Sequence, residues 1–216
     1  MVAQEASETE VWFYKIHKVK AMKTEDKKTE TPMRNQNAKS RNFVTDDGNV
    51  YILGEFDSTI STEVIHAVTS LANQMEAFKD PVIHIYINSC GGDAYELFGL
   101  LSVLDVAKSK GISVHTHVIG VAYSAGSILA AYGDHRTMSK YSDHLLHLGC
   151  AGAEFSTFEQ LKREAENNIK HFNKILRIYS EHTKIPKKKL EEMLKDDKLY
   201  LDAEQCLKYG ICDEIT

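Results

Sequence analysis

From residue 50 onward, strand-like and helix-like segments alternate along this chain, and this order restricts the fold more than any other feature. Three runs rich in apolar and β-branched residues are typical of buried strands, namely Val50–Gly54, Val82–Asn88 and Ile112–Ile119. Between them the sequence predicts two helices, one from Ser61 to about Phe78 and one from Ala94 to Ser109. Strands and helices in this order predict a parallel or mixed sheet in an α/β domain.

Further elements are predicted after the third strand. They are an interior helix of small residues at Ser124–Ala131, a short strand at Leu145–Leu148, a long amphipathic helix at Ser156–His182, a helix whose first turn holds Pro186, and a last helix that ends near Gly210. Asp202, followed three residues later by Gln205, predicts a capping box at the start of that last helix.

The N-terminal part of the chain has a different composition. From Lys15 to Arg41 there are nine Lys or Arg against three Asp or Glu, with no helical or strand-like period. We expect residues 1–43 to form a flexible or atypical arm and residues 44–216 to form the folded domain. The apolar island Val11–Ile16, which holds the only Trp, is either a strand of that domain or a docking segment.

Composition and charge argue against several classes of protein. With 43% hydrophobic and 26% charged residues, wholesale disorder is excluded, and no apolar run approaches the roughly eighteen residues that span a membrane. The formal net charge of −5 argues against general attraction to nucleic acid, and the acidic start lacks a secretory signal. The four cysteines form no CxxC pair, which disfavours zinc and favours free thiols in a reducing compartment. We therefore expect a cytoplasmic protein that needs no metal or other cofactor.

The segment Gly120–Gly126 (GVAYSAG) is the strongest candidate for chemistry. Ser124 follows an apolar strand, is flanked by small residues and opens a helix, so its hydroxyl would lie near free backbone N–H groups at the positive end of that helix. Such N–H groups can bind an oxyanion, and the pattern nearly matches the nucleophile elbow of serine hydrolases. The alternative is that Ser124 only caps the helix.

A nucleophilic serine needs a base, and ten histidines are available. His144 and His147 lie in a strand-like segment about twenty residues after Ser124, whereas His115 and His117 share one face of the preceding strand. The latter pair could bind a metal, but a partly exposed strand face is the simpler interpretation. The pattern does not show which of the 31 acidic residues would orient the base.

The glycine pair Gly91-Gly92 lies between a predicted strand and a predicted helix. It lacks the third glycine of a dinucleotide loop and the lysine of a P-loop, which disfavours a nucleotide site. A glycine pair also lets backbone N–H groups approach an oxyanion or an extended peptide closely.

Taken together, these segments resemble the proteolytic-subunit family of the Clp protease, ClpP. Four segments in order carry the resemblance, which runs from about residue 50 to residue 216: VYILGEFDSTIS, IYINSCGG, GVAYSAG and LDAEQCLKYGICDEI. The resemblance implies a ClpP/crotonase-like α/β fold of repeated ββα units with a protruding handle helix. The atypical N-terminal arm is what a divergent branch, such as a phage-encoded copy, would show.

The resemblance also implies roles for individual residues. Ser124 matches the nucleophile and His147 the base, whereas His144 matches a position without a catalytic role. The second glycine of the pair, Gly92, and Ala125 match the oxyanion donors, with Gly91 beside them in the substrate-binding turn.

The third member of the triad is the least determined by the resemblance. The family has an Asp five residues before the Ala that opens the last helix, and here that position is Lys198. A one-residue slip would bring Asp197 into place, with Asp196 and the capping residue Asp202 as the alternatives. The segment after His147 also lacks the Gln-Pro that follows the base in the family, which leaves the substrate groove and ring stacking open.

For activity, the resemblance implies a serine endopeptidase that cleaves unfolded polypeptides inside stacked heptameric rings of identical subunits, fed by an AAA+ ATP-dependent unfoldase. The alternative within the family is a non-catalytic ring subunit with a role in assembly or regulation. Outside it, an enoyl-hydratase-like enzyme is disfavoured by the pairing of Ser and His, and a membrane-linked signal peptide peptidase by the lack of an apolar anchor.

Overall fold

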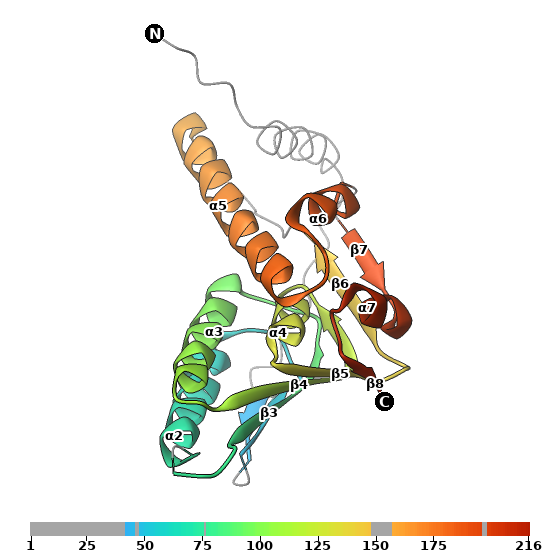
Figure 1. Cartoon of the computed structure of the whole chain (residues 1–216). Coiled ribbons are helices and arrows are strands. Elements are labelled where there is room, and N and C mark those ends of the chain that lie inside the picture. The colour runs from blue at the N-terminus through green and yellow to red at the C-terminus, as the bar shows by residue number, and fades with distance from the viewer. Residues whose placement is uncertain (1–41, 46–47, 76, 148–156, 196–197) are drawn as a thin grey trace. The chain divides into compact units, whose positions relative to one another are not determined.

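The computed structural model describes residues 42–45, 48–75, 77–147, 157–195 and 198–216 (Figure 1). Contacts divide the chain into two units, one of residues 1–38 with 150–173 and the other of residues 39–149 with 174–216. The second unit carries every described element except the first part of the long helix α5, Phe158–His182. Most of the predicted N-terminal arm, with the island Val11–Ile16, lies outside the described residues.

A mixed sheet of eight strands, counted over the described ranges, organises the second unit. The path β1-β2-β3-β4-β5-β8 consists of Asn42–Val44, Asn49–Ile52, Val82–Ser89, Ser113–Tyr123, His135–Met138 and Glu214–Ile215. All neighbours on this path are parallel except β1 and β2. The end of β4 also pairs in parallel with β6, Asp143–His147, which pairs antiparallel with β7, Lys198–Leu201. The α/β fold class predicted from the sequence is confirmed.

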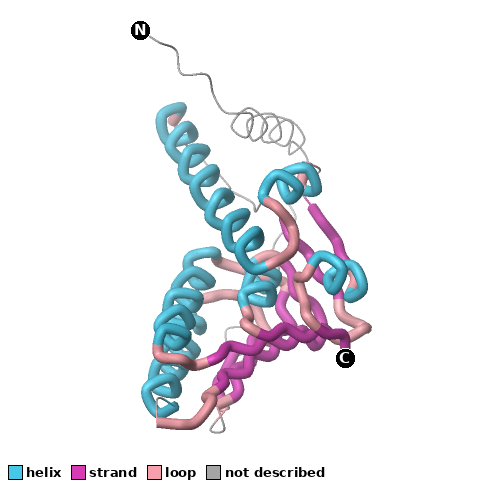
Figure 2. Tube along the Cα trace, in the orientation of Figure 1, coloured by secondary structure: helices cyan, strands magenta, loops and turns pink. Residues whose placement is uncertain are grey.

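Helices cover this sheet and separate its strands in sequence. A π-helical turn, Ile60–Val64, leads into α2, Ile65–Met75, which lies beside α3, Ala94–Ser109 (Figures 1 and 2). Helix α4, Ala125–Tyr132, is buried along its whole length and packs on β3, β4 and β6. The C-terminal elements include α6, Lys187–Met193, and α7, Ala203–Tyr209.

Alternation along β3 explains where the core lies. Ile83, Ile85 and Ile87 are fully buried, whereas His84 and Tyr86 on the opposite face are half-buried. A strand with β-branched residues at every second position buries one face against helices, as the period of two requires. The apolar run of β3 therefore determines which face of the sheet α3 and α4 cover.

The predicted elements are present, with shifts of a few residues at their ends. Helix α2 ends at Met75, and Phe78, near which the predicted helix was expected to end, lies past the helix end with 62% of its surface exposed. The strands β1, β5, β7 and β8 were not predicted. They have two to four residues each and little apolar alternation, so only their pairing partners in the sheet define them.

Candidate active site

Ser124 occupies a strained turn between β4 and α4. Its backbone has φ of 54° and ψ of −119°, a region that side-chain-bearing residues adopt only when their surroundings force it, at a cost of about 1–3 kcal/mol. The Ser124 N–H donates to the Leu145 carbonyl of β6 at 2.8 Å, and the Ser124 carbonyl accepts from Ser127 N–H at 3.0 Å and Ser127 Oγ at 2.6 Å. Anchors from β6 and from α4 thus hold the serine in this conformation.

Strand β6 brings one of the candidate histidines to this turn. His147 is the last residue of β6, which lies beside the end of β4 through the pairs Val121–Asp143 and Tyr123–Leu145. His147 Nε2 lies 2.7 Å from Ser124 Oγ, at hydrogen-bond distance. When the hydroxyl donates to Nε2, the neutral ring carries its proton on Nδ1. This is the arrangement in which an imidazole can remove the hydroxyl proton.

The neighbouring His144 lies on the opposite side of β6 and does not face Ser124. It is fully buried, its Nε2 lies 2.8 Å from Tyr179 Oη, and burial lowers its pKa to about 3. A histidine kept neutral and held in this way is unsuited to exchange protons with a substrate. The structure therefore distinguishes two histidines that sequence spacing alone left open.

The glycine turn approaches Ser124 more closely than any other residue type would allow. A Cβ built on Gly91 would lie 2.5 Å from Ser124 Cβ, and Gly91 has φ of 99°. Gly126, in the first turn of α4, similarly lies against Ser89, where a Cβ would be 3.2 Å from the backbone oxygen. Close packing against Ser124 therefore explains the glycine at position 91. The approach of the glycine turn to an oxyanion or an extended peptide stays a prediction.

A backbone bridge fixes the orientation of Gly92. The Phe56 N–H donates to the Gly91 carbonyl at 2.9 Å, and the Asp93 N–H donates to the Phe56 carbonyl at 2.8 Å. In such a parallel bridge the middle residue, Gly92, directs its own N–H to the edge away from Phe56. Gly92 as a residue is exposed. The sequence analysis did not find the role of Phe56, because a contact between positions as far apart as 56 and 92 leaves no local signal in the sequence.

Ala125 supplies a second backbone donor beside Ser124. It is the first residue of α4, where an N–H group has no partner within its own helix. Its peptide group is the one that contains the Ser124 carbonyl, so the contacts of that carbonyl also set the direction of this N–H. An N–H group beside a serine that is paired with histidine could help to stabilise the oxyanion of an acyl-transfer reaction. The same role for Gly92 stays a prediction.

The structure describes only one of the three aspartates considered as the third member of the triad. Asp197, the expected third member of the triad, and Asp196 lie outside the described residues. The residue that follows them, Lys198, is paired with His147 across β6 and β7. Asp202 forms the predicted capping box: its carboxylate accepts from Gln205 N–H at 2.8 Å, and the Gln205 side chain accepts from Asp202 N–H at 3.0 Å.

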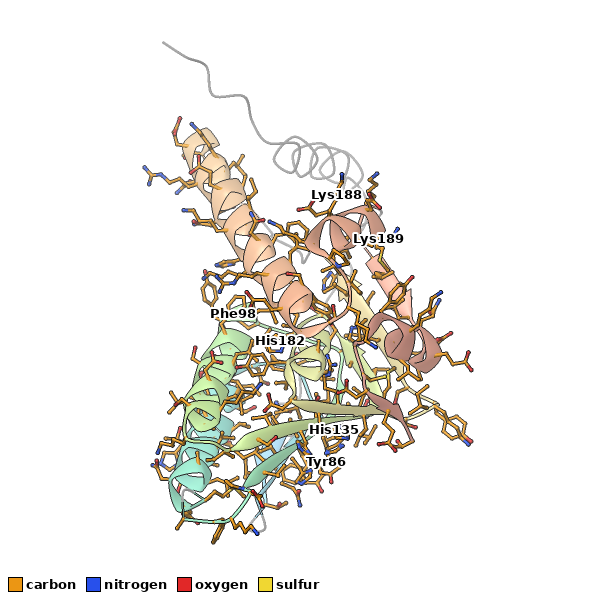
Figure 3. All side chains as sticks on the ribbon, in the orientation of Figure 1. Tyr86, Phe98, His135, His182, Lys188 and Lys189 are labelled. Carbon is orange, nitrogen blue, oxygen red and sulfur yellow. The ribbon has the colours of Figure 1, made fainter. Side chains whose placement is uncertain are left out.

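The other histidine pair of the sequence analysis lies on the sheet face opposite the helices. His115 and His117 contact His84, and His115 also contacts His135, which is labelled in Figure 3. Burial, followed by repulsion from His84, lowers the pKa of His117 to about 4. Within the described ranges, no group of three or more His, Cys, Asp or Glu could hold a metal ion. Nor is any helix of those ranges long and apolar enough to cross a membrane.

Comparisons with known proteins point to a single family. Residues 32–216 match the sequence model of the Clp protease family. The chain is 32% identical over 135 residues to an ATP-dependent Clp protease proteolytic subunit of Deinococcus radiodurans, covering 62% of this chain and 64% of that protein. It is 30% identical over 168 residues to ATP-dependent Clp protease proteolytic subunit 2 of Bacillus licheniformis, covering 77% and 84%. The proteolytic subunit of Streptococcus mutans is 28% identical over 169 residues, covering 77% and 83%.

Proposed function

This chain belongs to the Clp protease family, and we propose that it is a serine endopeptidase that cleaves polypeptides through an acyl-enzyme. The observation that carries the proposal is the 2.7 Å contact between Ser124 Oγ and His147 Nε2 at a turn with positive φ. A serine that only caps a helix needs neither the strained backbone nor an imidazole at its hydroxyl. Both features are expected of an activated nucleophile.

In the proposed mechanism, Ser124 Oγ attacks the carbonyl carbon of the peptide bond while its proton passes to His147 Nε2. The carbonyl oxygen becomes an oxyanion, which accepts hydrogen bonds from the N–H groups of Gly92 and Ala125. The C–N bond then breaks, and the departing amine takes the proton from His147. Water attacks the acyl-ester and gives a proton to His147, which returns it to Ser124 Oγ as the acid product leaves.

A carboxylate at His147 Nδ1 completes the proposal. It would hold the ring in the tautomer whose Nε2 is unprotonated and can accept the proton of Ser124 Oγ. It would also stabilise the imidazolium that forms during the reaction. We assign this role to Asp197, which precedes the partner of His147 in β7. Asp202 is the less suitable residue, because its carboxylate caps α7.

The assembly and its partners are proposed from the family. The relatives bear the name of proteolytic subunits of an ATP-dependent protease. We propose that this chain likewise forms stacked heptameric rings in the cytoplasm and receives unfolded polypeptides from an AAA+ ATPase.

The test is covalent labelling of the purified protein by a fluorophosphonate, read by intact mass. Labelling of the parent that is lost in Ser124→Ala would support the proposal. Asp197→Ala should slow labelling by up to about 10⁴-fold, because the imidazole loses control of its tautomer. Asp202→Ala is the matched control: it should lower stability by about 1 kcal/mol through loss of a cap, with labelling retained.

Sedimentation of the same samples tests the alternative within the family, a ring subunit without catalytic activity. Ser124→Ala should assemble like the parent, since the change removes only a hydroxyl. A folded, assembled parent that the probe does not label would contradict the enzymatic proposal and favour a non-catalytic ring subunit. Equal labelling of the parent and Asp197→Ala would instead reject Asp197 as the third member of the triad.

A further inference from the structure

Two buried serines lie beside the serine elbow, and the mechanism proposed above uses neither of their hydroxyl groups. Ser89 is the last residue of β3, and Ser127 lies in the first turn of α4. Both belong to the unit of residues 39–149 with 174–216. The two segments meet at Gly126, where an added Cβ would lie 3.3 Å from Ser89 Cβ. One serine therefore stands on each side of the contact between the end of β3 and the start of α4.

Ser127 holds the peptide group between Ser124 and Ala125. Its Oγ–H donates to the Ser124 carbonyl at 2.6 Å, and its N–H donates to the same oxygen at 3.0 Å. Serines inside helices often bond a carbonyl three or four residues earlier. This carbonyl, however, belongs to a residue with φ of 54° and ψ of −119°, outside the helical region. Because a peptide group is planar, holding the Ser124 carbonyl also sets the direction of the Ala125 N–H, which points the opposite way.

Ser89 holds the glycine turn in a similar way. The Gly91 N–H donates to Ser89 Oγ at 3.1 Å, and the Gly91 carbonyl accepts from the Phe56 N–H at 2.9 Å. Gly91 has φ of 99° and no Cβ, so few steric limits restrict the rotation of its backbone. These two hydrogen bonds hold Gly91 at both ends. They thereby also set the direction of the Gly92 N–H, which shares a planar peptide group with the Gly91 carbonyl.

From these contacts we propose that Ser89 and Ser127 are positioning residues. Ser89 aims the Gly92 N–H, and Ser127 aims the Ala125 N–H, at the oxyanion of the reaction. The proposal rests on the proposed serine peptidase function. An N–H that donates to the oxyanion binds more strongly as charge develops on the substrate, so its aim affects the transition state more than the ground state. Loss of either hydroxyl should therefore lower kcat and leave KM nearly unchanged.

The first experiment removes each hydroxyl and measures kcat and KM in a peptide-cleavage assay. Ser127→Ala should lower kcat about tenfold, less than the loss of a whole oxyanion donor, because the Ala125 N–H stays in place but is held less firmly. Ser89→Ala should have a similar effect through Gly92. A variant with the kcat of the parent, or one that changes KM alone, would overturn the positioning role of that serine.

The matched control is Ser142→Ala. Ser142 is also a buried serine, and its Oγ–H donates at 3.1 Å to the carbonyl of Val118 in the middle of β4. Each of the three variants removes one buried hydrogen bond, so urea unfolding should show similar losses of stability. Ser142→Ala should nevertheless keep the kcat of the parent. Equal losses of kcat in Ser142→Ala and Ser127→Ala would overturn the proposal, because lower stability would then explain both.

The second experiment does not depend on activity. In protein labelled with ¹⁵N at alanine and glycine, the amide resonance of Ala125 should move in Ser127→Ala. The resonance of Gly92 should move in Ser89→Ala, and neither should move in Ser142→Ala. A resonance that stays in place would reject the corresponding positioning contact.

Fluorophosphonate labelling of the parent distinguishes a failure of this proposal from a failure of the proposed function. A labelled parent whose Ser89→Ala and Ser127→Ala variants keep full kcat would reject the positioning role and leave the peptidase function intact. A parent that the probe does not label would reject the peptidase function, and the positioning role with it, even if both resonances move.

Discussion

Replacement of Gly91 by alanine tests whether close backbone approach builds the site. The added methyl group would lie 2.5 Å from Ser124 Cβ and 2.9 Å from the Tyr123 carbonyl oxygen. Neither neighbour is the free end of a flexible side chain, because Ser124 is anchored to β6 and α4. The clash must therefore be relieved by moving the glycine turn, the elbow or both.

The size of the effect follows from these distances. Carbon atoms of this kind come no closer than about 3.4 Å without strain, so a displacement of about 1 Å is needed. If it falls on Ser124, the 2.7 Å contact with His147 Nε2 is lost. A misplacement of this size costs about 10²-fold in rate, or about 2.7 kcal/mol of transition-state stabilisation. The alanine also adopts φ of 99°, which costs about 1–2 kcal/mol of stability.

Gly111→Ala separates the effect of the steric clash from that of the backbone penalty at positive φ. Gly111 has φ of 82° and no atom within 4 Å of the position of an added Cβ, so it meets the backbone penalty without the clash. Both variants would be measured by urea unfolding and by the rate of fluorophosphonate labelling. We expect Gly111→Ala to lose about 1 kcal/mol of stability with labelling unchanged. Gly91→Ala should lose more stability and label about 10²-fold more slowly. Equal labelling rates in the two variants would refute the argument from close approach.

Two further predictions concern pH. Burial lowers the pKa of His144 to about 3 in the folded chain, while the unfolded chain takes up the proton near pH 6.5, so stability should fall as the pH drops below about 6.5. Urea unfolding at pH 7 and pH 5 should show a loss in the parent about 2 kcal/mol larger than in His144→Leu; equal losses would contradict the burial argument. Asp213 pairs with Arg136 through Nε at 2.9 Å and Nη2 at 2.7 Å, and these hydrogen bonds hold its pKa below the ordinary value. Asp213→Asn should lower the free energy of unfolding at pH 7 by only about 1 kcal/mol, since the ion pair is partly exposed. The difference in stability from the parent should shrink as the pH falls through the lowered pKa of Asp213. A difference that stays constant in acid would reject the ion pair as its cause.

Local patterns in the sequence were sufficient for the main elements and for the position of the proposed nucleophile. Alternating isoleucines define β3, a helical period defines α5, and Asp202 with Gln205 marks the start of α7. These signals involve residues a few positions apart, so they are readable without the fold. The roles of Gly92, Ala125 and Asp197 came from the resemblance to the family and stay predictions.

The tertiary structure decided which side chains meet. His144 and His147 have similar sequence surroundings, yet the pairing of β6 with β4 turns His147 toward Ser124 and buries His144 against Tyr179. The bridge from Phe56 to the glycine turn likewise joins residues far apart in sequence. The sequence by itself determined the strands β2, β3, β4 and β6, the helices and the serine elbow, because each depends on the chemistry of near neighbours. The order and register of the strands brought the histidine and the glycine turn to that elbow, because those contacts exist only once the sheet has formed.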